Sequence, residues 1–197
     1  MLRNMTNEYK SDMTFELIDS KSISWGITYG LIEAAREREK SHDFQKVVAA
    51  AKEAVKNTSC LFVIPTQSYL KKGGRMGRVE GTVGDILNIK PIVGVDELLD
   101  GQYFTIKKVR GRKKSIHAIY EIAYDLVKDK KSFEIVVLHG GAEQEAQEIY
   151  DKFKAMTNCT CVRLAPVSPV IGVHTGPGLV AFGIYSEEGL GRMKEDK

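Results

Sequence analysis

The apolar run Cys60-Leu-Phe-Val-Ile64 is the stretch on which the predicted fold depends. A run without polar alternation suits a strand that is covered on both faces, as in a parallel sheet. Helical spacing predicts two helices ahead of it, one capped by Ser22 or Ser24 and one over about 43–56. Residues 14–18 alternate in character and predict a short strand. The order strand, two helices, strand is that of a parallel crossover unit.

Beyond the glycine-rich stretch 73–78, predicted strands and helices alternate along the chain. They are strands at 89–95 and 102–109, a helix at 114–127, a strand at 133–138, a helix at 142–155, and strands at 159–164 and 179–184. The sequence therefore predicts an α/β fold in two domains. Residues 1–72 would form a partial N-terminal parallel-sheet domain, because two strands alone make a poor sheet. Residues 73–197 would form a C-terminal domain with a mixed sheet.

The composition is that of an ordinary globular protein. The 197 residues are 43% hydrophobic and 28% charged, with a net charge of +3. No apolar run reaches the roughly 18 residues of a membrane span, and the N-terminus lacks the apolar stretch of a signal peptide. Three cysteines argue against a disulfide framework and favour the cytoplasm. Membrane insertion and a disulfide scaffold are therefore not expected.

The segment Ser168-Pro-Val-Ile-Gly-Val-His-Thr-Gly-Pro-Gly178 carries the strongest signal for a binding site. It places an imidazole and a hydroxyl, those of His174 and Thr175, between an apolar run and a Gly-Pro-Gly turn. Apolar surface with a few polar groups is typical of a small-molecule pocket. A core histidine is the alternative. An enzyme using His174 as acid or base would need a reacting partner, and the sequence near it offers no such partner.

Two pairs of residues have spacings that bear on ligand binding. Arg75 and Arg78 lie among glycines, and on a helix they would share one face and could grip a carboxylate or phosphate. A solvated basic turn is the alternative. Gly26 and Gly30 lie within a predicted helix, so either another helix or a ligand chain must come close to that face. Helix packing is the favoured explanation.

A basic segment precedes and opens the predicted helix at 114–127. Its six positive charges within eight residues are Lys107, Lys108, Arg110, Arg112, Lys113 and Lys114. Such a segment can dock an acidic or phosphorylated partner, or can simply be a solvated strand end. Interleaved aromatics and a reading motif are both missing from it, so nucleic acid is not the expected partner. Cys159 and Cys161 lack further ligands at metal spacing and predict buried thiols, with no metal or cofactor.

Five segments together resemble the DegV family of bacterial fatty-acid-binding proteins. They occur in the family's order across about residues 14–184. They are Asp19-Ser-Lys-Ser22, Tyr69-Leu-Lys-Lys-Gly-Gly-Arg75 with Gly77-Arg78, Leu87-Asn-Ile-Lys-Pro-Ile92, Lys108-Val-Arg-Gly-Arg-Lys-Lys114 and Pro169-Val-Ile-Gly-Val-His-Thr-Gly-Pro-Gly178.

The resemblance implies a two-domain protein without catalytic activity that encloses one long-chain fatty acid. The acyl chain would lie in an apolar tunnel, and the acid would be presented to a separate fatty acid kinase. The resemblance places the carboxylate at His174 and Thr175, with help from Arg75 or Arg78. It implies kinase docking through Arg110 and Arg112. The tunnel lining is expected at Gly26, Gly30, Ile171 and Gly172.

The chain also departs from the family pattern. Family members begin with roughly a hundred further residues, which hold an Asp-Ser strand, a Thr-Ser-Gln-Pro-type loop and a Ser-Gly-Thr-Tyr-type turn. These motifs do not occur here. A truncated product is therefore expected, with weakened lipid affinity and self-association through an uncovered sheet edge. The alternative function is an interaction module that docks the kinase and holds little or no lipid.

Overall fold

The computed structural model describes residues 4, 6, 7, 13–76, 79, 88–95, 100–191 and 193. Its centre is a six-stranded sheet with the strand order β3-β2-β1-β6-β4-β5. Only β4 and β5 run parallel to each other, and the other neighbours are antiparallel. The strands are β1 (Thr58–Val63), β2 (Ile89–Val95), β3 (Phe104–Arg110), β4 (Phe133–Gly140), β5 (Cys159–Pro166) and β6 (Leu179–Tyr185).

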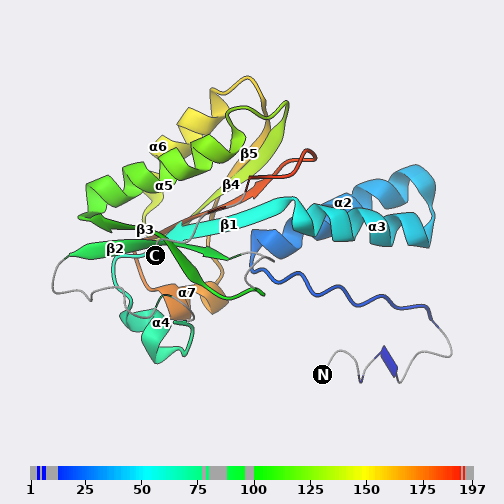
Figure 1. The fold of residues 1–197 in the computed structure, drawn as a ribbon, viewed down its shortest axis with the longest axis horizontal. Coiled ribbons are helices and arrows are strands. Elements are labelled where there is room, and N and C mark those ends of the chain that lie inside the picture. The colour runs from blue at the N-terminus through cyan, green and yellow to red at the C-terminus, as the bar shows by residue number, and fades with distance from the viewer. Residues whose placement is uncertain are drawn as a thin grey trace.

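The helices lie on both faces of this sheet (Figure 1). One face is covered by α5 (Arg112–Val127) and α6 (Glu143–Lys154). The short helices α4 (Ser68–Lys72) and α7 (Pro169–Thr175) lie on the opposite side. A hairpin of α2 (Trp25–Ser41) and α3 (Phe44–Lys56) extends beyond the end of the sheet.

The larger core lies between the sheet and the pair α5 and α6. Alternate residues of β1, β4 and β6 point into it, as the period of two in a strand requires. The Phe153 ring of α6 packs edge-on against Phe133 and Phe182, with ring centroids 6.1 and 6.0 Å apart. All three rings are at most 1% exposed. This aromatic cluster joins α6 to two strands of the sheet.

The α2–α3 hairpin is attached to the sheet through a smaller cluster. The Tyr29 ring stacks on the Tyr185 ring of β6 at 5.3 Å, and Ala54 of α3 completes the contact. Asp43 caps α3 by accepting hydrogen bonds from the backbone N–H groups of Gln45 and Lys46. Ser24 directly precedes α2 but makes no side-chain capping bond.

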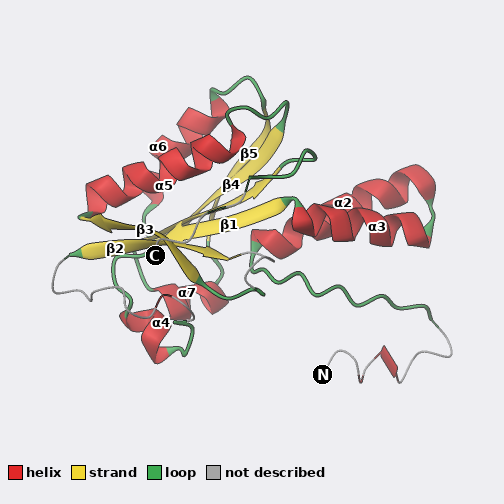
Figure 2. Cartoon of the chain, in the orientation of Figure 1, coloured by secondary structure: helices red, strands yellow, loops and turns green. Residues whose placement is uncertain are grey.

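The predicted parallel crossover in the N-terminal part is wrong. The apolar run at 60–64 does form a buried strand, but β1 pairs antiparallel with both β2 and β6. Residues 13–20 are extended without belonging to a strand (Figure 2).

Because β1 lies between β2 and β6, the predicted domain boundary between residues 72 and 73 would cut through one sheet. The edge strands of that sheet are β3 and β5, so neither edge of the described sheet comes from residues 1–72.

Most other predicted elements are confirmed within one to three residues at each end. The mixed sheet of the C-terminal part is also confirmed. Two short helices were not predicted. One is α7, which precedes the expected Gly-Pro-Gly turn; it begins with Pro169 in its first turn and is followed by Gly176 at φ 74°. The other is α4, which ends before Arg75, so Arg75 does not lie on a helix, and Arg78 falls outside the described residues.

Candidate functional site

A cavity lies on the sheet face opposite α5 and α6, between the start of α2 and the helix α7. Its exposed walls are apolar, although Ser24, Thr175 and Cys60 are among the residues that line it. The residues that line it are Ile23, Ser24, Trp25, Cys60, Leu61, Phe62, Leu138, Val167, Ile171, Thr175, Leu179, Ala181 and Phe182. These walls favour an apolar ligand or part of one.

The cavity is narrow, with a volume of only about 30 Å³. That is room for one or two water molecules. Three strands supply much of its wall, and their ladder hydrogen bonds fix the distance between them. The two walls that can move without breaking the sheet are the start of α2 and the helix α7. An elongated apolar ligand therefore needs one of these walls to shift.

His174 lies in the last turn of α7 and packs against α4. A Cβ atom added to Gly73 would come within 2.2 Å of His174 Nδ1, so only glycine lets the imidazole lie there. This Nδ1 is buried and has no hydrogen-bond partner among the described residues. Buried polar atoms are nearly always paired, so an unpaired one favours a ligand contact. The amide Nε2 of Gln67, just before α4, is also buried without a partner in the described part of the chain.

Thr175 and Ile171 lie one turn apart on α7 and both line the cavity. The Thr175 hydroxyl donates a 3.0 Å hydrogen bond to the carbonyl of Ile171. Its proton is therefore used within the helix, and the oxygen can only accept from a ligand. Thr175 is buried at 5% exposure. The pair predicted from the sequence is thus divided, with Thr175 on the cavity and His174 at the α4–α7 contact.

Arg75 and His174 meet at the same glycine. The Arg75 guanidinium donates to the Gly73 carbonyl at 2.5 Å and is otherwise exposed. Burial raises the pKa of Tyr103, and the positive charge of Arg75 partly opposes this rise. Tyr103 in turn packs edge-on against Phe62 of the cavity wall, at 5.4 Å. The Arg75 cation therefore lies at the glycine against which the imidazole packs and acts electrostatically on Tyr103, whereas Arg78 lies outside the described residues.

The glycines expected in the tunnel lining lie elsewhere. Gly26 packs against Ser22 and the Cys60 thiol, and Gly30 packs against Val55 of α3. Gly30 thus meets another helix, as the favoured helix-packing explanation predicts, whereas Gly26 meets the segment before α2 and strand β1. Gly172 has open space around it and does not line the cavity. Ile171 is the one residue of the predicted lining that the structure places there.

The basic segment lies on β3 and the first turn of α5. Arg112 forms a bidentate ion pair with Glu145 of α6, and both side chains are partly buried. This arginine joins two helices rather than facing solvent. Arg110 is exposed, as are the four lysines of the segment, Lys107, Lys108, Lys113 and Lys114. The surface that a partner could reach is therefore Arg110 with these lysines.

Burial raises the pKa of two of the three thiols. Burial raises the pKa of Cys60 to about 11, so this cavity thiol stays protonated and unreactive at neutral pH. Burial also raises the pKa of Cys159 to about 11. Within the described ranges, no three His, Cys, Asp or Glu side chains gather as metal ligands. No helix of the described part has the length and apolar character needed to cross a bilayer.

Sequence reasoning alone missed several residues of this site. Trp25, Phe62 and Ala181 come from three distant parts of the chain and meet only through the sheet topology. Tyr103 and Gln67 carry no motif by themselves. The signal that could have found Gln67 is its position just before the Tyr69 motif.

Comparison with known proteins gives a consistent result. The DegV family model, described as a family of uncharacterised proteins, matches residues 1–187. A DegV domain-containing protein of Clostridium acetobutylicum is 40% identical over 187 residues, which are 94% of this chain and 65% of that protein. The chain therefore spans about two thirds of the length of this relative.

Solved structures show the same fold. A fatty-acid-binding DegV family protein of Streptococcus agalactiae superposes with a TM-score of 0.80 at 24% identity, covering 93% of this chain and 64% of that one. A stearic-acid-binding protein of Eubacterium ventriosum superposes with a TM-score of 0.77 at 22% identity, covering 94% and 64%. The family model matches nearly the whole length of this chain, and one relative is 40% identical to it. This chain therefore belongs to the DegV family.

Proposed function

We propose that this chain binds a long-chain fatty acid. The acyl chain would lie against the apolar sheet face between the start of α2 and α7. The carboxylate would lie at the α4–α7 contact. The observation that carries this proposal is the buried Nδ1 of His174, which has no hydrogen-bond partner among the described residues and lies beside an apolar cavity, with Arg75 at the same glycine. The fatty acids named for the solved relatives support the choice of ligand class.

The apolar sheet face and the polar α4–α7 contact together suit a ligand with an apolar chain and a carboxylate. Each methylene that leaves water for the apolar face contributes about 0.8 kcal/mol. A carboxylate that accepts from the imidazole and a guanidinium adds charge-assisted hydrogen bonds of about 1.5–3 kcal/mol each. The polar contact fixes the orientation of the ligand, and the acyl chain supplies most of the affinity.

The substitution His174→Ala tests this site. Losing one charge-assisted hydrogen bond should weaken binding of palmitate or oleate about tenfold to hundredfold. Displacement of a fluorescent fatty acid measures the affinity, and native mass spectrometry of the purified chain shows which acids it carries. His117→Ala, at an exposed histidine of α5, is the matched control and should bind as the unmodified chain does. Equal affinities for the two variants would contradict the assignment of His174.

The exposed basic segment supports a partner-binding role beside lipid binding. We propose that Arg110 and its neighbouring lysines dock an acidic face of a fatty acid kinase, to which the bound acid is presented. Arg112 is left out of this surface, because its ion pair with Glu145 already uses its charge. If the chain binds no lipid, docking through this segment remains as its function.

A charge reversal on this surface tests the docking proposal. Arg110→Glu combined with Lys114→Glu should reduce capture of the kinase in a pull-down about tenfold or more, because complementary charge becomes repulsive. The control is Lys40→Glu combined with Lys46→Glu, an equal charge change on the exposed α2–α3 hairpin. Capture that falls equally in both variants, or in neither, would refute docking at this surface.

A further inference from the structure

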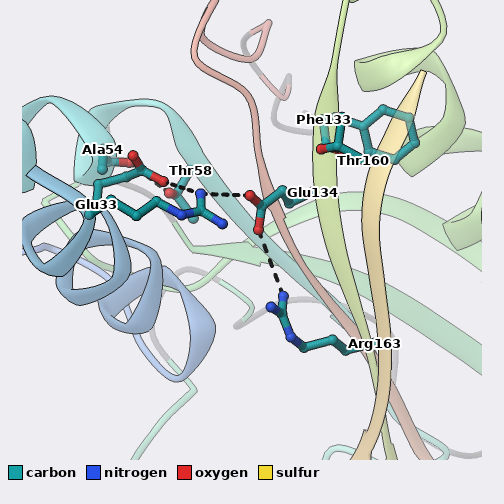
Figure 3. Close-up of polar contacts among 8 residues, drawn as sticks. Glu33, Ala54, Thr58, Phe133, Glu134, Thr160 and Arg163 are labelled. Carbon is teal, nitrogen blue, oxygen red and sulfur yellow. Dashed lines mark hydrogen bonds and ion pairs between the residues drawn. The ribbon is translucent and has the colours of Figure 1, made fainter. Parts of the chain in front are cut away.

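A carboxylate is buried between α2 and the sheet, away from the cavity. Glu134 of β4 is only 8% exposed. Its Oε1 lies 2.7 Å from Arg36 Nη1 of α2, and its Oε2 lies 3.7 Å from Arg163 Nη1 of β5. Arg36 also pairs with Glu33 at 2.5 Å (Figure 3). The two arginines reach solvent, and their charges balance those of Glu33 and Glu134, so Glu134 is buried without being a lone ion.

The network and the cavity share one face of the sheet. Glu134 and Leu138 lie on the same side of β4 because side chains alternate along a strand, and Leu138 lines the cavity. On α2, Arg36 lies roughly three turns from Trp25, which forms the cavity wall. Arg163 links the ion pairs to the cavity wall directly. Its guanidinium pairs with Glu134 and lies 5.6 Å from the centre of the Trp25 ring. The network therefore holds the helix that carries the cavity wall.

Trp25 lies tightly on the sheet at this point. A Cβ atom added to Gly183 of β6 would approach the Trp25 Cβ to 2.4 Å. Just before Trp25, Ser24 has φ 51° and ψ −123°, and Lys21 has φ 47°. Non-glycine residues rarely adopt positive φ, and such strain gathers at joints that serve a function. The start of α2 thus packs closely on β6, directly after the segment 21–24, which contains two residues with positive φ.

We propose that Glu134, Arg36 and Arg163 form an ionic latch that positions Trp25 and sets how far the cavity opens. When the latch is closed, α2 lies on the sheet and the cavity keeps its narrow volume. When the pairs at Glu134 are broken, the start of α2 moves outward and the cavity widens for an acyl chain. The role of the latch in ligand entry rests on the proposed lipid binding, whereas its hold on Trp25 does not.

Trp25 is the only tryptophan of the chain, so its fluorescence reports the latch without any ligand. In Glu134→Gln, two arginines lose their shared counter-ion. The Stern–Volmer constant for acrylamide quenching should rise about twofold or more, because breaking a buried pair strongly destabilises the docked state. Arg36→Gln should act in the same direction. Arg36 is half exposed at the surface of α2, so this variant tests the latch if Glu134→Gln fails to fold.

The matched control is Arg38→Gln, which removes a surface arginine of the same helix whose partner is the exposed Glu39. Its quenching constant should equal that of the unmodified chain. Quenching in Arg36→Gln that equals the control would overturn the latch, whatever the lipid data show. Palmitate titration of the same proteins separates the two proposals. Raised quenching without palmitate binding in any of them would uphold the latch and refute lipid binding.

Discussion

Replacing Phe182 with alanine should lower the free energy of unfolding by about 3–5 kcal/mol. Phe182 lies on β6, between β1 and β4 at the centre of the sheet, and is 1% exposed. Its ring packs edge-on against Phe153 of α6. The substitution removes this contact and leaves a cavity between the sheet and α6. Because domains are usually stable by only about 5–15 kcal/mol, the loss is a large share of the total.

Urea denaturation followed by circular dichroism measures this effect. The control is Phe44→Ala at the start of α3, where the ring is 43% exposed. Removing an exposed ring should change the stability by no more than about 0.5 kcal/mol. A Phe182→Ala variant as stable as Phe44→Ala would show that the centre of the core does not lie at β6.

The positions of the elements could be predicted from the sequence because they depend on local pattern. Periodicity of 3.6 or 2 residues is a local feature, and the helices and strands that it predicts are confirmed except for the strand at 14–18. Strand pairing is not local. The run at 60–64 is equally apolar whether its neighbours are parallel or antiparallel. Its partner β6 comes at the far end of the chain, and no periodicity identifies it.

The segment around His174 shows how local signals can be given the wrong weight. From the sequence we predict the Gly-Pro-Gly turn at 176–178 but no helix before it. In the structure Ser168-Pro169 starts a helix, and Gly176 ends it. These are ordinary start and stop signals for a helix only two turns long. The helix changes the site, because it directs Thr175 and Ile171 to the cavity and His174 to Gly73.

The substitution Ile171→Glu should reduce fatty-acid affinity at least about a hundredfold. Ile171 lines the cavity from α7, so the new carboxylate would face the apolar sheet where the acyl chain is proposed to lie. Binding would then desolvate a charge without a partner and lose apolar contact, and each of these costs reaches several kcal/mol. Because Ile171 is half-buried on a short peripheral helix, the fold itself should tolerate the change.

The neighbouring Val170 provides a control of equal charge. Val170 lies on the same helix but is 73% exposed and does not line the cavity. Val170→Glu adds the same negative charge near the same ligand, so both variants repel a fatty-acid carboxylate at long range. The difference in Kd between them isolates the effect of the cavity wall. If the two variants bound palmitate equally well, the acyl chain would have to lie outside the space between α2 and α7.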